Sequence, residues 1–366
     1  MHILFIGTHV PNDIEAVEPG ISSAGNRFQN NFIKNVRELG HEVDEVSFIA
    51  VPIKAPTAFS DSSRYVLKSG NPIKSVKAFH DLIRAKESDC DIIICYNIVY
   101  AWLNLPKLAR KAHIKSIAII ADYSEEDSYK SFARKVYVKL QRSCMRKFDK
   151  IVGLSANIEK QLKPKQQFVL VEGGIDRAFY DKFDSITEKP ADAPVTVMYS
   201  GLLEPVTGVD LLLDAIKDID KSLNAKFVFT GKGSLADKIT QAAKEDSRID
   251  FKGNLSYDDY ISTLKSADIL VNPRNMLLPE NRNNFPSKVL DYLATGKTII
   301  STKFVGWEKF ENHVIFTDES ALSTTITENV TNIQNGTIAN DDNRIFAEQF
   351  LWEKQIKTIL TDRESD

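Results

Sequence analysis

The chain of 366 residues is poor in cysteine and contains no long apolar run. Its three cysteines, Cys90, Cys95 and Cys144, are odd in number and include no C-x-x-C pair, which argues against a disulfide framework or a zinc site. No apolar run reaches the length of a membrane span, and residues 1–13 lack the basic and apolar regions of a signal peptide. We therefore expect a cytoplasmic protein, with peripheral contact to the inner membrane face left open.

An excess of charge of one sign is also missing. The 47 basic and 50 acidic residues give a net charge of −3, so the chain as a whole has no signature of nucleic-acid binding. Histidines, cysteines and carboxylates do not cluster at the spacing of a known zinc or calcium site. We therefore predict no nucleic-acid partner and no metal requirement.

Short apolar runs alternate with helical patterns along the first half of the chain. Residues 2–7 form such a run, and residues 25–40 then place apolar side chains at helical spacing between two glycines. Further buried strands are predicted near residues 41–48, 90–97, 114–120 and 149–155. Strands that alternate with helices predict a parallel sheet covered by helices on both faces.

The second half restarts the same pattern. A strand over 195–201 is followed by an amphipathic helix over 208–219 and a second strand over 225–231. Residues 181–194 are rich in charge, proline and small side chains, which is typical of a linker. The sequence thus predicts two Rossmann-like domains, over residues 1–180 and 195–345. Ligands bind beyond the carboxyl ends of the strands in such sheets, so we expect the site in the cleft between the domains.

The stretch "NNFPSKVLDYLATGK", residues 283–297, combines a buried helical stripe with charged side chains. Pro286 suits the first helical turn, and free N–H groups from about residue 287 to 289 would bind an anion. Lys288 adds a positive charge at the same point, and the Asp291 carboxylate could accept hydrogen bonds from sugar hydroxyls. Alternatively, both side chains are solvated and Asp291 only stabilises the helix dipole. This stretch alone leaves both interpretations open.

Two further features of the first half suggest sites. Gly20 and Gly25 flank a loop before the first predicted helix, where glycine permits close backbone approach to a phosphate or sugar, although a flexible loop has the same pattern. Asp122 follows a predicted strand at a position where a carboxylate is costly unless it is used or solvated. Among the six histidines, only His9 has such a position.

The predicted helix over residues 129–148 carries seven basic residues and no acidic one. Apolar residues gather on one side (Phe132, Val136, Tyr137 and Leu140), and basic residues occupy the rest (Lys130, Arg134, Lys135, Lys139, Arg142, Arg146 and Lys147). A basic amphipathic helix can lie on an anionic membrane. An ordinary helix with a buried stripe and a solvated face is the competing interpretation.

Several of these stretches together resemble the retaining glycosyltransferases of family 4. The resemblance runs through "GHEV" (40–43), "VEGGID" (171–176) and "FLWEKQIKTIL" (350–360). Its most specific part is "FPSKVLDYLATGKTIIST" (285–302), which is similar to a branch with an FPSK motif where other members have two glutamates. The resemblance implies a GT-B fold, with two Rossmann-like domains facing each other across a cleft. A C-terminal helix, at about 346–366, would return to the first domain.

The resemblance also implies an activity and a donor, and together with the glycines and charged residues near predicted strand ends it predicts a set of site residues. The activity is transfer of a hexose, with retention of configuration, from a UDP- or GDP-linked sugar to a hydroxyl of a glycan, lipid-linked or protein acceptor, without a cofactor, in glycan or polysaccharide biosynthesis. The donor would contact Gly20, Gly25, Gly201, Lys232, Asn283, Phe285, Pro286, Ser287, Lys288, Val289 and Asp291. Catalysis would involve Asp122, Lys288 and Arg274.

The sequence departs from the family at four donor-site positions. Asn283 and Asp291 stand where the two glutamates are usual, and Leu202 and Thr207 stand where an arginine and a lysine neutralise the diphosphate. We expect Lys288, Lys232 and Arg274 to replace that charge. The same losses favour an alternative, a non-catalytic homologue that acts as a partner subunit for another glycosyltransferase. A nucleotide-sugar epimerase is a weaker third interpretation.

Overall fold

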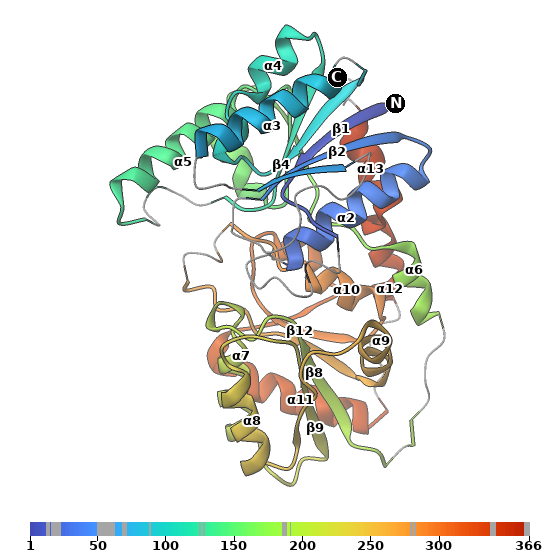
Figure 1. The fold of residues 1–366 in the computed structure, drawn as a ribbon. Coiled ribbons are helices and arrows are strands. Elements are labelled where there is room, and N and C mark those ends of the chain that lie inside the picture. Colours follow the sequence, from blue (N-terminus) through green and yellow to red (C-terminus); the bar gives the residue numbers. More distant parts are fainter. Residues whose placement is uncertain are drawn as a thin grey trace. The chain divides into compact units, whose positions relative to one another are not determined.

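The chain folds into two compact units, Met1–Gly174 with Trp352–Asp366, and Ile175–Leu351 (Figure 1). The computed structural model describes residues 1–11, 15, 23–49, 63–67, 72–87, 89–123, 126, 129–184, 189–190, 192–278, 281, 283–336 and 342–361. Of the helices in these ranges, none has both the length and the apolar character that a membrane span needs. The described residues of the predicted linker, 181–184, 189–190 and 192–194, belong to the span of the second unit.

The first unit is built on a seven-stranded parallel sheet. Its strand order is β3 (Ser63–Leu67), β2 (Glu42–Ile49), β1 (His2–Gly7), β4 (Ile92–Tyr96), β5 (Lys115–Ile120), β6 (Lys150–Gly153) and β7 (Gln167–Leu170). The helices are α2 (Ser23–Glu38), α3 (Pro72–Glu87), α4 (Leu105–Lys111), α5 (Phe132–Met145) and α13 (Trp352–Leu360). Helix α2 begins and ends two residues before the predicted range 25–40, and α5 is shorter than the predicted 129–148.

Alternate side chains of each strand pack on opposite faces of this sheet. In β1, Leu4 and Ile6 belong to a core that includes residues of α3, α4 and α5, whereas Ile3 and Phe5 belong to a second core with residues of α2 and α13. Strands buried on both faces explain why the sequence showed near-continuous apolar runs. The predicted alternation of strands and helices is therefore confirmed for this half.

The second unit contains a six-stranded parallel sheet. Its order is β10 (Ile249–Phe251), β9 (Ala225–Thr230), β8 (Val195–Ser200), β11 (Ile269–Asn272), β12 (Thr298–Thr302) and β13 (Ile315–Thr317). One face packs residues of α7 (Val209–Asp218), α8 (Ala236–Glu245) and α11 (Leu322–Gln334). The other packs residues of α6 (Arg177–Tyr180), α9 (Tyr257–Ser266), α10 (Lys288–Ala294) and α12 (Asp342–Ala347).

The C-terminal helix α13 packs into the first unit. The Trp352 indole contacts Phe28 and Phe32 of α2, with ring centroids 5.0 and 6.1 Å apart. The buried Lys150 ammonium donates hydrogen bonds to the carbonyls of Ile359 (2.8 Å) and Thr361 (2.7 Å) at the end of this helix. These carbonyls have no partner within the helix, so Lys150 satisfies them and also favours the negative end of the helix dipole. The chain thus crosses back at residue 352, a few residues after the predicted 346.

Candidate functional site

The strand order of the second unit reverses between β8 and β11. The chain proceeds from β8 to β9 and β10 on one side, and then returns to β11, β12 and β13 on the other. Such a reversal is the point at which doubly wound sheets bind ligands, beyond the carboxyl ends of the strands. Gly201 follows β8 and Arg274 follows β11 closely, so two predicted site residues lie at this edge.

Two loops rich in glycine lie against each other at this edge. The Gly201 N–H donates to the Thr230 carbonyl (3.0 Å). Gly231 has φ 136°, and a Cβ there would lie 1.8 Å from the Gly201 carbonyl oxygen, so only glycine fits. The Glu204 carboxylate accepts hydrogen bonds from the Ser234 N–H (2.7 Å) and from its hydroxyl. These contacts hold the loop after β8 and the loop after β9 together. The exposed Lys232 lies in the second of these loops.

Helix α10 begins later than the sequence predicted. It starts at Lys288, two residues after Pro286, and the chain makes a tight turn between them. The Val289 N–H donates to the Pro286 carbonyl (2.9 Å), and the Leu290 N–H donates to the Ser287 carbonyl (3.1 Å). The prediction that the N–H groups of residues 287–289 are free to bind an anion is therefore wrong at Val289, because that N–H is used within the turn.

Lys288 instead brings its side chain to the glycine loops. Its Nζ lies 4.0 Å from the centroid of the Tyr199 ring and 3.0 Å from the position that a Cβ would take on Gly201. This nitrogen is buried and has no hydrogen-bond partner in the described part of the chain. Burial and, to a smaller extent, the positive charge of Arg274 together lower the pKa of the Lys288 ammonium to about 7. A negative ligand group at this point would stabilise the charged form.

Tyr292 fixes α10 to the end of β8. Its buried hydroxyl forms hydrogen bonds with the Ser200 N–H (3.1 Å) and the Ser200 hydroxyl (3.2 Å). The neighbouring Tyr199 hydroxyl donates to the Leu202 carbonyl (2.7 Å), which shapes the loop after the strand. Sequence reasoning missed both tyrosines. The available signal was a tyrosine in the buried stripe of a helix, since a buried phenol hydroxyl needs a partner.

Arg274 is held in place by an asparagine that sequence reasoning also missed. The Arg274 Nε donates to the Asn281 side-chain oxygen (2.7 Å). The buried Asn281 amide in turn donates to the carbonyls of Val206 (2.7 Å) and Asn275 (2.6 Å). Asn281 thus links the Arg274 guanidinium group to the backbone of two loops and fixes its orientation. Supporting hydrogen bonds of this kind hold a charged group in position.

The remaining predicted donor residues differ in exposure. Asn283 is buried, Ser287 is exposed, and Asp291 is partly exposed in the first turn of α10. Phe285 packs in an aromatic cluster with Phe304 and Phe310, with ring centroids 5.3 and 5.5 Å away. Phe285 therefore helps to anchor the segment before α10 in the core.

Asp122 and Gly25 belong to the first unit. Asp122 is exposed after β5 and accepts a hydrogen bond from the Asn97 amide (3.2 Å). The Asn97 oxygen accepts from the N–H groups of Ala121 (2.8 Å) and Asp122 (3.1 Å), and Asn97 itself has φ 54° after β4. Asn97 thus joins the ends of β4 and β5, next to the point where this sheet reverses between β1 and β4, and sequence reasoning missed it. Gly25 lies in the first turns of α2, whereas Gly20 lies outside the described residues.

His9 lies in a buried hydrogen-bond network of the first unit. Its ring is buried between the Glu45 carboxylate (2.9 Å) and the Ser47 hydroxyl (2.7 Å). Burial alone would raise the pKa of Glu45, but the hydrogen bond and charge of His9 and the charge of Arg37 hold it below its usual value.

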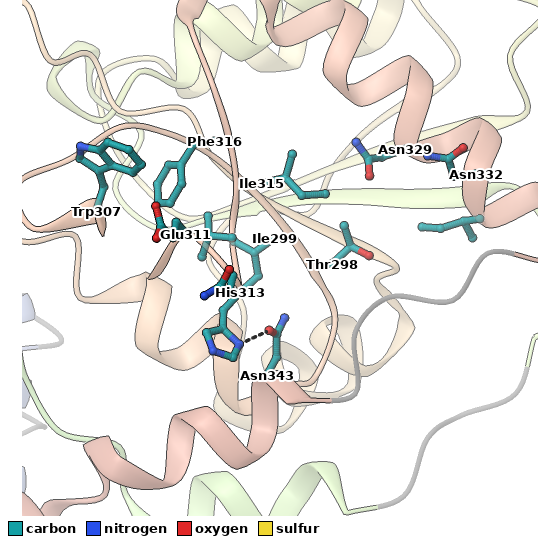
Figure 2. A pocket seen from close by; sticks show the side chains of 13 residues that line it. Thr298, Ile299, Trp307, Glu311, His313, Ile315, Phe316, Asn329, Asn332 and Asn343 are labelled. Atoms are coloured by element: carbon teal, nitrogen blue, oxygen red, sulfur yellow. Dashed lines mark hydrogen bonds between the residues drawn. The ribbon is translucent and has the colours of Figure 1, made fainter. Parts of the chain in front are cut away.

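A hollow of about 430 Å³ lies at the opposite edge of the second sheet (Figure 2). It is lined by Thr298 and Ile315, which begin β12 and β13, and by Trp307, His313 and Asn343 among others. It includes none of the predicted site residues, so we do not assign the donor to it. Within the described ranges, no three histidine, cysteine or acidic side chains gather as a metal site requires, and metal independence stays a prediction.

Part of the second unit matches a known family model. Residues 194–332 match the model described as Glycosyl transferases group 1. A curated relative, described as an uncharacterised glycosyltransferase of Methanocaldococcus jannaschii, is 26% identical over 222 residues. The match covers 58% of this chain and 58% of that protein, so the chain spans little more than half the length of the relative.

Solved glycosyltransferase structures resemble nearly the whole chain. The lipopolysaccharide outer core galactosyltransferase WaaB is similar with a TM-score of 0.68 and 16% identity, over 98% of this chain and 99% of that one. HepE of Anabaena, solved in complex with UDP, has a TM-score of 0.71 and 13% identity, over 97% and 98% of the two chains. Sucrose-phosphate synthase of Thermosynechococcus elongatus has a TM-score of 0.72 and 15% identity, over 96% and 95%. The likeness confirms the predicted fold, GT-B with two Rossmann-like domains.

Proposed function

We propose that this protein is a glycosyltransferase that moves a sugar from a nucleotide-diphosphate-sugar to an acceptor hydroxyl. The match of residues 194–332 to a glycosyltransferase model supports the reaction class. HepE, a structural neighbour, was solved with UDP and with UDP-glucose, which supports a UDP-linked donor here. Retention of configuration, the hexose and a role in polysaccharide biosynthesis are parts of the proposal that rest on the sequence resemblance.

The placement of the donor site rests on one observation. The Lys288 ammonium is buried at the point where the strand order of the second sheet reverses. Leu202 and Thr207 lack the charge that the family places in the loop after β8. Lys288 brings a cation to that same loop from α10, because its Nζ lies against Gly201. An unpaired buried cation is costly, and a diphosphate would offset that cost.

In the proposed reaction, the acceptor oxygen bonds to the anomeric carbon while the bond from that carbon to the phosphate oxygen breaks. The acceptor proton passes to the leaving phosphate oxygen, so no separate base is needed. Lys288 and Arg274 stabilise the negative charge that grows on the diphosphate, and preorganised charge of this kind is a large term in catalysis. Asp122 would hold the acceptor hydroxyl.

The first test is the thermal stability of the protein with nucleotide diphosphates and their sugars, without added metal. We expect the matching nucleotide, at a hundred times its dissociation constant, to stabilise the protein by roughly 2.7 kcal/mol. The Lys288→Ala variant should lose most of this shift. Lys309→Ala is the matched control, because the Lys309 ammonium also lies over an aromatic ring, that of Phe350 at 4.6 Å, but belongs to a different part of the unit.

The second test is turnover, measured as release of the nucleotide diphosphate in the presence of acceptors. Lys288→Ala should reduce turnover by about a hundredfold, the usual effect of removing one preorganised donor to developing charge. Lys288→Arg should restore only part of it, since a planar guanidinium does not fill the space of an ammonium. No thermal shift with any nucleotide would contradict the proposal, and donor binding without turnover would favour the partner-subunit alternative.

A further inference from the structure

Helix α5 exposes an apolar stripe to solvent. The stripe consists of the residues Phe132, Val136 and Leu140, which are 81%, 39% and 50% exposed. Their spacing of four residues places them on one face of the helix. The face that packs on the first unit is a different one and consists of Val138, Cys144 and Met145. The prediction of an ordinary helix with a buried stripe is therefore wrong for these three residues, whereas Tyr137, the fourth residue of the predicted stripe, is partly buried.

The exposed stripe is a fixed feature of the first unit. The Tyr137 hydroxyl and the Gln141 amide both donate hydrogen bonds to the Ile98 carbonyl, at 3.3 and 2.5 Å. These two side chains lie on the inner side of α5 and tie it to the segment after β4. The rotation of the helix is thus set by its inner contacts, which leaves Phe132, Val136 and Leu140 directed outward.

Positive charge borders the stripe. Lys135 and Lys139 each precede a stripe residue by one position, so they follow the same edge of the stripe from one helical turn to the next. Lys139 lies 3.4 Å from the Glu126 carboxylate and Arg142 lies 3.2 Å from it. One carboxylate faces two of the seven basic residues of the region 129–148, which itself contains no acidic residue. The surface therefore combines exposed apolar side chains with net positive charge.

We propose that α5 docks the protein on an anionic lipid surface. The stripe would enter the boundary between headgroups and acyl chains, and the lysines would contact lipid phosphates. An apolar face bordered by basic residues is the pattern of helices that lie in the membrane interface. Positive charges near an anionic leaflet add to the attraction. This inference stands on the first unit alone and does not depend on the proposed glycosyl transfer.

The test is co-sedimentation with vesicles of phosphatidylcholine alone and of phosphatidylcholine mixed with phosphatidylglycerol. We expect the wild-type chain to bind the anionic vesicles and to be released as salt rises, because salt screens exposed charges. The triple variant Phe132→Ser, Val136→Ser, Leu140→Ser should bind at least about tenfold more weakly, since it loses the buried apolar area. Lys135→Gln with Lys139→Gln should weaken binding by a smaller factor.

Two controls make this result specific. Ile345→Ser and Tyr257→Ser each remove an exposed apolar side chain of the second unit, 69% and 54% exposed in the wild type, and both should bind as the wild type does. Equal melting temperatures would establish that all variants fold. No binding to anionic vesicles, equal binding to neutral ones, or undiminished binding of the triple variant would overturn the proposal. Light scattering that shows a wild-type dimer and a monomeric triple variant would overturn it as well, in favour of self-association.

Discussion

At the residue scale, Lys288 has the most unusual environment. Its ammonium lies between the Tyr199 ring and the Gly201 backbone, a cation–π contact that compensates only part of the lost hydration. The lysine therefore favours the neutral form in the folded protein without ligand, and its pKa is lowered to about 7. Such a group gains its charge when an anion arrives.

This lowered pKa predicts how stability depends on pH. In the unfolded chain a lysine stays protonated to about pH 10.4, so between pH 7 and pH 10 the unfolded state binds up to one proton more at this site. The free energy of unfolding should then rise with pH by up to about 1.4 kcal/mol per unit in this window, relative to Lys288→Met. Calorimetry of both proteins at pH 7 and pH 9 measures this difference, and parallel pH profiles would contradict it.

Asp291 gives a second prediction at this scale. Its carboxylate is partly exposed in the first turn of α10, so Asp291→Asn should leave the fold intact. If the carboxylate accepts hydrogen bonds from the ribose hydroxyls, its loss should weaken nucleotide affinity by roughly tenfold or more, since hydrogen bonds to charged groups contribute about 1.5–3 kcal/mol. Isothermal titration compares the two proteins. Equal affinities would show that Asp291 serves only the helix dipole.

At the element scale, the paired loops after β8 and β9 form the base of the candidate site. They are held by backbone hydrogen bonds and by the contact of Glu204 with Ser234. At Gly231 and at Gly233 an added Cβ would lie 1.8 and 2.3 Å from carbonyl oxygens of the loop after β8, so the two backbones leave no room for a side chain. The geometry of the site therefore depends on the distance between the backbones of these two loops. None of the site residues predicted from the sequence sets that distance by its side chain alone.

Gly231→Ala tests the loops as a unit. The added Cβ would lie 1.8 Å from the Gly201 carbonyl oxygen, so the loops must separate. We expect nucleotide binding to be lost and the melting temperature to fall. Gly253→Ala is the control, because Gly253 also has positive φ (64°) but nothing lies within 4 Å of its added Cβ. It should show only the strain of the left-handed conformation, about 1–2 kcal/mol. Equal effects of both substitutions would argue against a special role for the loop contact.

At the scale of the whole molecule, the last helix belongs to the first unit although it follows the second in sequence. Trp352, Ile356 and Ile359 are buried in the core of the first unit, and a Cβ on Gly174 would touch the Trp352 ring at 2.1 Å. The first unit is thus assembled from both ends of the chain.

Trp352→Ala should destabilise the first unit by roughly 3–5 kcal/mol, the usual loss for truncation of a large buried aromatic side chain. Hydrogen exchange with mass spectrometry measures this locally. Amides of α2 and β1 should exchange faster, because the truncated side chain packs against α2. Amides of β8 and β9 serve as the internal control and should be unchanged, and equal acceleration in both units would contradict the assignment of α13.

The sequence by itself determined the alternation of strands and helices, and with it the two doubly wound sheets. Its apolar runs are local signals, since a strand buried on both faces needs an apolar residue at every position. The sequence also placed Gly201 and Arg274 after strands, because the carboxyl ends of parallel strands meet at one edge. For α5, the basic pattern was visible, but both a buried and an exposed apolar stripe were compatible with it.

Only the tertiary structure decided what those residues contact. The proximity of Lys288 to Gly201 joins positions 87 apart in the chain and depends on the Tyr292 hydroxyl at the end of β8. Asn97 and Asn281 act through hydrogen bonds to other loops, and their sequence neighbourhoods contain no sign of those partners. The outward stripe of α5 is set by contacts with the segment after β4. Periodicity reports which residues share a face, whereas long-range packing determines whether that face is buried or presented to solvent.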